Sequence, residues 1–598
     1  MIFLLKRKFQ KFWTRKKYLN KKRIYLDKKI LLSFFIAVFF FPLSSCQPKQ
    51  VKIPELPADR HQPHDYIGKK GMVVAAHPLA VQAGLEVLKK GGNAIDAAIA
   101  SAFALNAAEP FASGIGGGGF MVLFLAQENR VTVINFREKA PAQAHPSMFL
   151  ENGKVKNDWR KAHGLAVAVP GALAGWSYAL KKYGTMQLAE VMGRSIQIAE
   201  QGFLVSKTFS QINKDEYEKI LLNAGATSPY LNQGLPYEPG DTFQNPDLAL
   251  TLRHIVSQGW QDYYKGEIAQ RIVEAVQNKG GVITLADLSQ YSPTEQPPLK
   301  GTYKEHTLYS IQPPGSGGLH IIQLLNITEH WPLKSWGFNS PEYIHHMGEA
   351  LRFVFADRAR YLGDPDFVTV PVEDLTSKKY AAQIAQKIIP DRLQDAYPYG
   401  RFDENLMEEE NTTHLSVIDE QGNIVSLTQS INDFFGSGIV PDGTGFLLNN
   451  HMADFSPQPD SINAPNPYRR PVSSMGPLIC FKKGKPFLIL GSPGGTRIFP
   501  SLTQIIINII EFGMSLDQAI EAPRFYTYSA QGKARNLFME SRIPPETVRS
   551  LEQIGHIIEI RDAFDKFFGG AQGIMVLSKK KILLGGADSR RDGSGAGY

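Results

Sequence analysis

The chain of 598 residues is 43% hydrophobic and 20% charged, which is an ordinary composition for a globular protein with a large core. Its formal net charge of +8 comes from the N-terminus, because residues 1–30 hold 12 Lys/Arg and one Asp and the other residues together carry a net −3. This distribution excludes nucleic-acid binding as an explanation of the basic charge.

The first 45 residues have the organisation of a secretory signal. The basic residues 1–30 are followed by a Phe-rich apolar run over 31–43 and then by Leu43-Ser44-Ser45-Cys46. A basic region, a short apolar region and small residues before a cleavage point are typical of such signals, and the run is too short for a comfortable membrane span. Because the ending is similar to a bacterial lipobox, we expect a signal peptide over residues 1–45 and lipidation of Cys46. An uncleaved signal anchor is the alternative.

This N-terminus predicts an exported protein of the periplasm or cell envelope, held at the membrane by its lipid anchor only. Residues 46–70 are polar and rich in proline, which indicates a tether between the lipid and the folded part. The only other cysteine, Cys480, lies in an apolar string over 477–481. We therefore expect a buried thiol and no disulfide in the mature protein.

Helices and hairpins alternate along the rest of the chain. Helical periodicity predicts helices within residues 77–108, 172–282, 341–361, 374–388 and 501–512. Alternating apolar residues around short polar turns predict two strands over 120–136 and hairpins over 414–429, 478–490 and 573–584. Hairpins interleaved with helices suit sheets that are covered by helices, so the pattern indicates an α+β protein.

Several motifs point away from a cofactor, a metal or a serine nucleophile. The string over 114–119 satisfies G-x-G-x-x-G, but a dinucleotide site needs a strand before it and a helix after it. Here the order is reversed, and tight backbone packing near the site explains the glycines better. His345, His346 and Glu349 share one predicted helix without a further ligand cluster, so we expect structural histidines. No G-x-S-x-G sequence occurs, which argues against a serine hydrolase.

The most informative stretch reads Asn411-Thr412-Thr413-His414-Leu415-Ser416. A threonine hydroxyl becomes a good nucleophile when the threonine is an N-terminus, because its own α-amine can then take the proton. That amine titrates near pH 8, close enough to neutrality for proton transfer. An internal threonine gains this chemistry only if the chain is cut before it. Two threonines ahead of a strand are, on their own, more often ordinary strand sequence.

Other blocks accompany this stretch in a fixed order. Downstream they read Ser430-Ile431-Asn432, Leu448-Asn449-Asn450-His451-Met452-Ala453-Asp454-Phe455, Arg470-Pro471-Val472-Ser473-Ser474-Met475 and Gly491-Ser492-Pro493-Gly494-Gly495-Thr496-Arg497. Upstream lie Gly91-Gly92-Asn93-Ala94-Ile95-Asp96, Glu109-Pro110 and Phe136-Arg137-Glu138-Lys139-Ala140-Pro141, and near the end Asp588-Ser589-Arg590-Arg591-Asp592-Gly593. From Gly71 to Tyr598 the order and spacing of these blocks resemble the γ-glutamyltranspeptidase family.

The resemblance implies a fold and a processing step. The fold is the four-layer α/β/β/α sandwich of the N-terminal-nucleophile hydrolases. The chain would be a proenzyme that cuts itself between Asn411 and Thr412 into a large subunit, 71–411, and a small subunit, 412–598, which stay together as a heterodimer. Thr412, rather than Thr413, would be the nucleophile. Ser430 stands where the family usually has threonine, whose hydroxyl supports the nucleophile, and Gly494 and Gly495 match the oxyanion-hole glycines.

The resemblance also implies a set of substrate-binding residues. A γ-glutamyl group carries a free α-carboxylate and a free α-ammonium, so its site must supply both charges. Arg137 would take the carboxylate bidentately, with the hydroxyls of Ser473 and Ser474. Asp454 would pair with the ammonium, and Asn432 would hydrogen-bond near it.

Two features depart from the family pattern. His451 stands where Gln or Glu is usual and would lie beside the substrate ammonium; a protonated histidine would repel that group. The connector over 455–472 is short, whereas some bacterial members have a longer one that forms a lid. We therefore expect a lidless enzyme with a more open pocket.

The expected activity is transfer of the γ-glutamyl group from glutathione or other γ-glutamyl compounds to water or to amino-acid and peptide acceptors, through a γ-glutamyl-Thr412 ester and without a cofactor. A same-fold acylase of the glutaryl type and a hydrolase that trims γ-polyglutamate are the alternatives. A non-catalytic envelope lipoprotein is a third, which the intact set of Thr412, Arg137 and the two glycines argues against.

Overall fold

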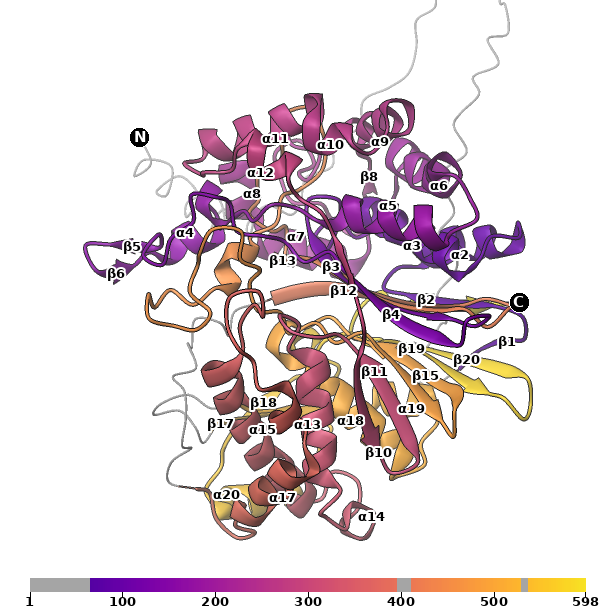
Figure 1. The fold of residues 1–598 in the computed structure, drawn as a ribbon, viewed down its shortest axis with the longest axis vertical. Coiled ribbons are helices and arrows are strands. Elements are labelled where there is room, and N and C mark those ends of the chain that lie inside the picture. Colours follow the sequence, from indigo (N-terminus) through magenta and orange to yellow (C-terminus); the bar gives the residue numbers. More distant parts are fainter. Residues whose placement is uncertain (1–64, 395–409, 529–535) are drawn as a thin grey trace, which may run out of the picture. The chain divides into compact units, whose positions relative to one another are not determined.

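The computed structural model describes residues 65–394, 410–528 and 536–598, which belong to one compact unit (Figure 1). The expected signal peptide, Cys46 and most of the expected tether lie outside these ranges. Within the ranges, no helix is both long enough and apolar enough to cross a bilayer.

Two seven-stranded sheets are formed by the described residues, and all of their strand pairs are antiparallel. The first sheet has the order β21 (Ser594–Gly597), β2 (Met72–Ala75), β12 (Glu410–Ile418), β13 (Ile424–Asp433), β3 (Gly118–Leu125), β4 (Arg130–Asn135) and β9 (Thr294–Gln296). The second sheet has the order β1 (Tyr66–Gly68), β20 (Ile582–Ala587), β19 (Gln572–Leu577), β15 (Lys485–Gly491), β14 (Leu478–Lys482), β11 (His306–Ser310) and β10 (Leu299–Tyr303).

The two sheets stack face to face through an apolar interface. It includes Val74 and Val122 from the first sheet and Ile479, Ile489 and Ile574 from the second, all of them buried. At about 25 cal/mol per Å² of apolar surface removed from water, such an interface is a main source of stability for the sandwich. It also holds β12 between two layers, away from solvent.

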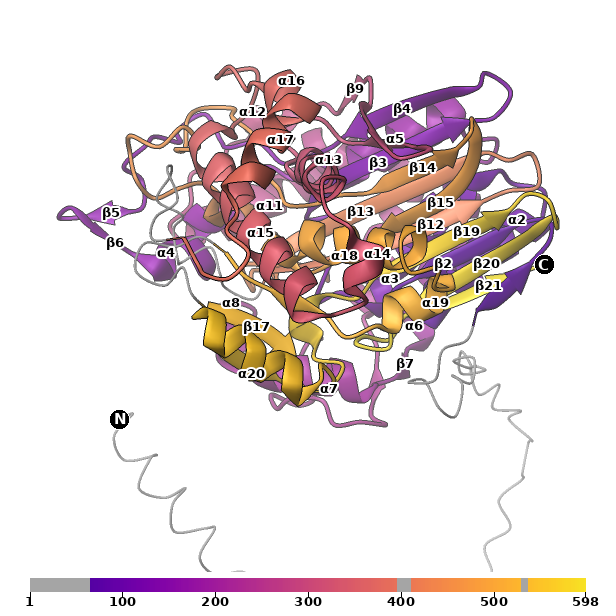
Figure 2. The same cartoon turned by 90° about the horizontal axis from the view of Figure 1, so that it is seen from below.

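Helices cover the outer face of each sheet (Figure 1). On the first sheet lie α2 (Pro78–Lys89), α3 (Ala94–Ala108) and α5 (Ala172–Tyr183), with α6 (Leu188–Gln201) packed on α3. On the second sheet lie α13 (Gly317–Thr328), α18 (Ile498–Ile510) and α19 (Leu516–Glu521), with α15 (Pro341–Tyr361) packed on α13. Figure 2 views the molecule from the side of these last helices. The predicted α/β/β/α sandwich is therefore confirmed.

Further elements surround this sandwich. The helices are α4 (Asn157–Lys161), α7 (Lys207–Asp215), α8 (Tyr217–Asn223), α9 (Pro246–Gln258), α10 (Asp262–Lys265), α11 (Glu267–Asn278), α12 (Leu285–Ser289), α14 (Leu333–Trp336), α16 (Val372–Leu375), α17 (Lys378–Lys387) and α20 (Pro545–Ile554). The strands are β5 (Leu150–Glu151), β6 (Lys154–Val155), β7 (Phe203–Leu204), β8 (Thr242–Phe243), β16 (Phe525–Tyr526), β17 (Asn536–Glu540) and β18 (Ile557–Arg561). Short 3₁₀ turns include η1 (Gly164–Ala166), η3 (His451–Asp454), η4 (Gly495–Arg497) and η5 (Lys566–Phe568).

The β12–β13 hairpin shows why its sequence alternates although both of its faces are buried. Leu415 and Leu427 belong to the apolar core shared with the helices. The polar residues face the other way: the imidazole of His414 lies 2.8 Å from the Thr428 hydroxyl, and Ser416 donates to the Gln572 carbonyl of β19 at 3.4 Å. Burial lowers the pKa of His414 to about 3, so this histidine is a neutral hydrogen-bonding residue between the sheets.

The predicted elements agree with the structure except where polar residues break a helix. The three predicted hairpins are β12–β13, β14–β15 and β19–β20. The helix expected over 374–388 divides into α16 and α17, because Ser377 caps α17 by accepting a hydrogen bond from the Tyr380 amide. The segment over 172–282 is mainly helical as expected, but its helices are interrupted where β7 pairs with β8.

Candidate active site

Thr412 lies at an irregularity in β12, an interior strand of the first sheet. Strand β12 pairs with β13 through Asn411 opposite Asn432 and through Thr413 opposite Gln429, so the register shifts at Thr412. Such a bulge bends one strand and redirects its side chains. Thr412 is buried, with 4% of its surface exposed.

The carbonyl group that precedes Thr412 is engaged by β13. Ser430 donates its hydroxyl hydrogen to the carbonyl oxygen of Asn411. The same hydroxyl oxygen accepts the backbone N–H of Asn432 at 2.8 Å. Asn432 has a φ of 77°, a conformation that is uncommon for a residue other than glycine. Its side-chain Nδ2 donates to the Asn450 carbonyl at 3.3 Å. The structure thus brings Ser430, Asn432 and the Asn411–Thr412 bond together.

The close approach of these strands depends on the glycine string over 114–119. A Cβ atom on Gly117 would lie 2.0 Å from the carbonyl oxygen of Ser430, and one on Gly118 would lie 2.6 Å from the Glu138 carboxylate. Both distances are below any real contact, so only glycine fits. The expected role of the string, tight backbone packing near the site, agrees with this geometry.

A C-terminal arginine clamps both residues of the bond. Arg591 donates to the side-chain oxygen of Asn411 at 2.5 Å and to the backbone carbonyl of Thr412 at 3.1 Å. Arg591 belongs to the block over 588–593 that resembles the family, but the sequence assigns it no role. The sequence feature that could have indicated a role for Arg591 is the Arg590-Arg591 pair, which lies between Asp588 and Asp592.

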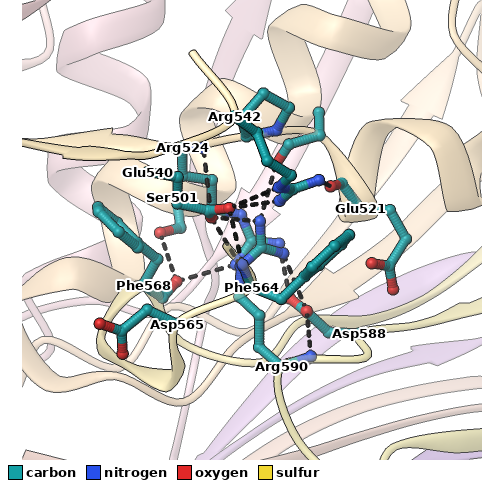
Figure 3. Close-up of polar contacts among 12 residues, drawn as sticks. Ser501, Glu521, Arg524, Glu540, Arg542, Phe564, Asp565, Phe568, Asp588 and Arg590 are labelled. Atoms are coloured by element: carbon teal, nitrogen blue, oxygen red, sulfur yellow. Dashed lines mark hydrogen bonds and ion pairs between the residues drawn. The ribbon is translucent and has the colours of Figure 1, made fainter. Parts of the chain in front are cut away.

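The loop that carries Arg591 is fixed by a buried network of charges (Figure 3). Arg590 donates to Glu540 at 2.9 Å and to Asp588 at 3.0 Å, and Arg524 donates to Asp588 at 2.6 Å. Arg542 contacts Glu540 from the other side. Burial opposes ionisation of Asp588, but Arg524 and Arg590 outweigh it and lower the pKa of Asp588 to about 2. The carboxylate is therefore charged at neutral pH and holds the loop in place.

The carboxyl group of Glu109 contacts Thr413, the residue that follows Thr412 in β12. Thr413 donates its hydroxyl hydrogen to Glu109 at 2.6 Å. Glu109 follows helix α3 and is buried. Burial raises the pKa of Glu109 to about 8, although Arg591 and the Thr413 hydroxyl act in the opposite direction. This residue also belonged to a recognised block without an assigned role.

The two glycines expected at the oxyanion hole form a turn against β12. Gly494 and Gly495 have φ values of 125° and 55°, which glycine adopts without a steric penalty. They precede and begin the turn η4, which packs against β12. Consecutive backbone N–H groups in such a turn make a concavity suited to an anion.

The residues expected to bind substrate gather around Arg137. This arginine is fully buried and contacts Asp454 as an ion pair. It also donates to Glu138 at 3.2 Å and to the Pro471 carbonyl at 3.3 Å. His451 shares the same group, since its Nδ1 lies 2.7 Å from the Glu138 carboxylate. The site therefore presents adjacent positive and negative side chains.

Ser473 and Ser474 follow this group along the chain. The hydroxyl oxygen of Ser473 accepts the Met475 amide at 3.2 Å, and its carbonyl accepts the Ser316 hydroxyl at 2.8 Å. The Ser474 hydroxyl accepts from Arg358 at 3.3 Å. The Asn432–Asn450 hydrogen bond joins the surroundings of Thr412 to the charged group around Arg137. Asn450 directly precedes the turn η3, which carries His451 and Asp454.

The two neighbouring histidines that the sequence offered as metal ligands are engaged in other contacts. His345 lies 3.0 Å from His556 and His346 lies 2.8 Å from the Glu342 carbonyl. Among the described residues, no group of three or more His, Cys, Asp or Glu is arranged to hold a metal ion. Cys480 is buried, and burial raises the pKa of its thiol to about 12.

A threonine near the start of an interior strand, in one of two stacked antiparallel sheets that are covered by helices, is typical of the N-terminal-nucleophile hydrolase class. The family model of gamma-glutamyltranspeptidase matches residues 80–598. The chain therefore belongs to the gamma-glutamyltranspeptidase family.

Known proteins resemble the chain over most of its length. The glutathione hydrolase proenzyme of Escherichia coli (strain K12) is 39% identical over 551 residues, which cover 90% of this chain and 93% of that protein. The glutathione hydrolase proenzyme of Bacillus subtilis (strain 168) is 39% identical over 92% of this chain and 94% of its own length. The crystal structure of cephalosporin acylase from Bacillus halodurans has a TM-score of 0.81 at 28% identity and covers 91% of this chain and 98% of that one.

Proposed function

We propose that this protein is a self-processing γ-glutamyltransferase and glutathione hydrolase. Cleavage between Asn411 and Thr412 divides the chain into a large subunit, 71–411, and a small subunit, 412–598, which remain associated. The observation that carries the proposal is the geometry of this bond: the Ser430 hydroxyl donates to its carbonyl and Arg591 holds the residues on both sides.

Processing proceeds by an N-to-O acyl shift. The Thr412 hydroxyl oxygen attacks the Asn411 carbonyl carbon, and the negative charge that develops on the carbonyl oxygen is stabilised by the Ser430 hydroxyl. The C–N bond then breaks and the nitrogen takes a proton, which leaves an ester between Asn411 and Thr412. Water hydrolyses the ester to a carboxylate at Asn411 and a free amine at Thr412. That amine becomes the general base for later turnovers.

The mature site binds the γ-glutamyl group through its charged ends. Arg137 takes the α-carboxylate with Ser473 and Ser474, while Asp454 takes the α-ammonium with Asn432. Adjacent positive and negative side chains at Arg137 and Asp454 match the two charges of an α-amino acid.

The Thr412 hydroxyl oxygen attacks the γ-carbonyl of the bound substrate while its proton passes to the Thr412 α-amine, and the N–H groups at Gly494 and Gly495 stabilise the oxyanion. The γ-amide C–N bond then breaks, and the leaving amine takes the proton and departs. The resulting γ-glutamyl-Thr412 ester passes the γ-glutamyl group to water or to an amino-acid or peptide amine. His451, bound to Glu138, borders the charged pair beside the substrate ammonium, which a protonated imidazole would repel.

An acylase of the same fold is the second candidate, because the similarity to a cephalosporin acylase extends over 91% of the chain. The two activities differ in whether the substrate carries an α-amino group. We expect a γ-glutamyl anilide to be hydrolysed faster than the matched glutaryl anilide, and this preference to collapse in Asp454→Asn. A native preference for the glutaryl anilide would establish the acylase instead. A γ-polyglutamate-trimming enzyme would hydrolyse the polymer in preference to the anilide.

We propose further that the protein is an exported lipoprotein that is anchored through Cys46. The support is the basic, apolar and Leu-Ser-Ser-Cys sequence over residues 1–46. In the native host, Cys46→Ser should move the protein from the membrane fraction to the soluble one. An unchanged membrane fraction would contradict lipidation.

A further inference from the structure

The segment that follows helix α3 contacts both strands of the β12–β13 hairpin next to the bond that the proposed processing cuts. In β12, Thr413 donates its hydroxyl hydrogen to Glu109 at 2.6 Å. In β13, Gln429 lies opposite Thr413 and donates its side-chain N–H to the Ser113 hydroxyl at 3.2 Å. One short segment therefore holds the hairpin beside the register shift at Thr412.

Glu109 is fixed to the sandwich through its own backbone. It directly follows the buried helix α3, and its N–H donates to the Leu105 carbonyl at 2.8 Å. The segment after it is attached to β13, because the Ile431 N–H donates to the Ala112 carbonyl at 3.1 Å. Glu109 and Thr413 are both buried, and a hydrogen bond that is excluded from water is electrostatically strong. The carboxyl group can therefore anchor the Thr413 side chain.

Arg591 links Glu109 to the bond itself. Its guanidinium donates to the Asn411 side chain and to the Thr412 carbonyl. Burial lowers the pKa of Arg591 and the charge of Glu109 opposes that effect, so the two groups lie close enough to interact. The charge of Asp592 also acts on Glu109, but the Asp592 carboxylate already accepts two hydroxyl groups at the start of α7.

We propose that Glu109 is a positioning residue for the cleavage, which anchors Thr413 and so keeps the Thr412 hydroxyl aligned with the Asn411 carbonyl. The inference rests on the proposed function. Glu109 exchanges no proton with the reacting atoms and acts only by fixing the next residue of β12. Alignment matters because the attack is intramolecular, and a misplacement of about 1 Å can lower such a rate about 100-fold.

The protonation state of Glu109 affects this alignment through Arg591. Burial raises the pKa of Glu109 to about 8, against the opposing effects of the Arg591 charge and the Thr413 hydroxyl. The neutral carboxyl group accepts the Thr413 hydroxyl and leaves Arg591 bound to Asn411 and Thr412. The ionised carboxylate attracts Arg591 and competes with Asn411 for it. The other charged residues that act on this pair are Asp588, Asp592 and Arg497.

The first experiment measures the processing rate of freshly synthesised proenzyme at pH 6.5, with urea unfolding to show that each variant is folded. Glu109→Ala and Thr413→Val should each slow cleavage about 10- to 100-fold. The variant that combines them should be no slower than the slower single variant, because both changes remove one hydrogen bond. Glu109→Gln should stay within about 3-fold of the native rate, since its amide oxygen still accepts the Thr413 hydroxyl.

The matched control removes a different buried hydrogen bond of the same helix. Ser101 of α3 donates to the Ala80 carbonyl at 2.9 Å, and Ser101→Ala should process at the native rate while folded. Slowing of Ser101→Ala to the same degree as Glu109→Ala would show that the packing of α3 controls the rate and would overturn the proposal. Native rates in folded Glu109→Ala and Thr413→Val would also overturn it. If Glu109→Ala does not fold, Thr413→Val decides alone, because it exchanges one hydroxyl for a methyl group.

The second experiment compares the native chain with Glu109→Gln between pH 6 and 9. The ratio of the native processing rate to that of Glu109→Gln should be constant below pH 7. It should fall by up to about 10-fold at pH 9, because about one tenth of a group remains protonated one unit above its pKa. A constant ratio over the whole range would overturn the role of the protonated carboxyl group. Absence of any native fragment that begins at Thr412 would contradict the proposed function, and with it the role of Glu109; native cleavage that the Glu109 variants leave unchanged would count against Glu109 alone.

Discussion

The Ser430 hydroxyl makes the sharpest mechanistic prediction, because it contacts the carbonyl that the proposed processing attacks. It donates to the Asn411 carbonyl and accepts the Asn432 N–H at 2.8 Å. Ser430→Ala removes both interactions and little volume. The first loss affects the transition state of cleavage, where the carbonyl oxygen becomes negative. The second affects the folded state, because the Asn432 N–H is buried.

The two losses have different sizes. Removing one oxyanion donor typically costs about 10²- to 10³-fold in rate, or about 2.7–4 kcal/mol. Leaving one buried N–H without an acceptor costs about 1–3 kcal/mol of folding free energy. We therefore expect Ser430→Ala to fold, to be somewhat less stable and to process at least about 100-fold more slowly than the native chain. Ser430→Thr restores the hydroxyl and the usual family residue, and it should process at a rate near that of the native chain.

The assay follows conversion of freshly synthesised proenzyme into two bands on denaturing gels at fixed temperature and pH. Urea unfolding of each variant separates a folding defect from a catalytic one. If Ser430→Ala processes at the native rate while folded, the hydroxyl does not stabilise the transition state and the reasoning is refuted. Equal slowing in Ser430→Thr would show that the native serine geometry, rather than the hydroxyl itself, is what matters.

Three further predictions test the surrounding charges. Arg137→Lys keeps the charge but loses the bidentate fork, so kcat/KM for a γ-glutamyl anilide should fall by an amount equivalent to about 1.5–3 kcal/mol; an unchanged value would exclude Arg137 from carboxylate binding. Burial raises the pKa of Glu109 from 4.5 to about 8. The stabilisation from its protonated form is therefore complete below pH 4.5 and is lost as the pH rises towards 8. The loss in unfolding free energy is at most about 5 kcal/mol. Glu109→Gln should flatten this decline in urea unfolding at pH 5, 6.5 and 8, whereas a parallel curve would contradict the raised pKa. Asp588→Asn leaves Arg524 and Arg590 without their shared carboxylate, so the unfolding free energy at pH 7 should fall by about 3–5 kcal/mol, and a loss below 1 kcal/mol would show that the network does not hold the loop.

Much of the fold could be predicted because its signals are local. Alternating residues around short turns identified all three hairpins, including β12–β13 with the candidate nucleophile. The layered sandwich needed the family resemblance, because periodicity alone does not say which sheet stacks on which. The break between α16 and α17 depends on one capping hydroxyl, Ser377, which a helical average over the window hides.

The site was less predictable where its contacts join distant parts of the chain. Arg591 reaches Thr412 across 179 residues, and Glu109 reaches Thr413 across 304. No local pattern indicates such contacts, so the sequence places both residues in blocks similar to the family without giving either a role. The sequence likewise assigned Arg137 and Asp454 to opposite ends of a substrate, whereas the structure shows them in contact. The Glu138 partner of His451 could not be inferred from adjacency in the sequence.

We propose that Thr412 is the nucleophile both of its own cleavage and of later turnover. The most direct measurement is the intact mass of the purified protein, with N-terminal sequencing of any small fragment, for the native chain and for Thr412→Ala. We expect a native fragment that begins at Thr412 and ends at Tyr598, and a single uncut chain in Thr412→Ala. Normal cutting in Thr412→Ala, or a native fragment that begins at another residue, would contradict it.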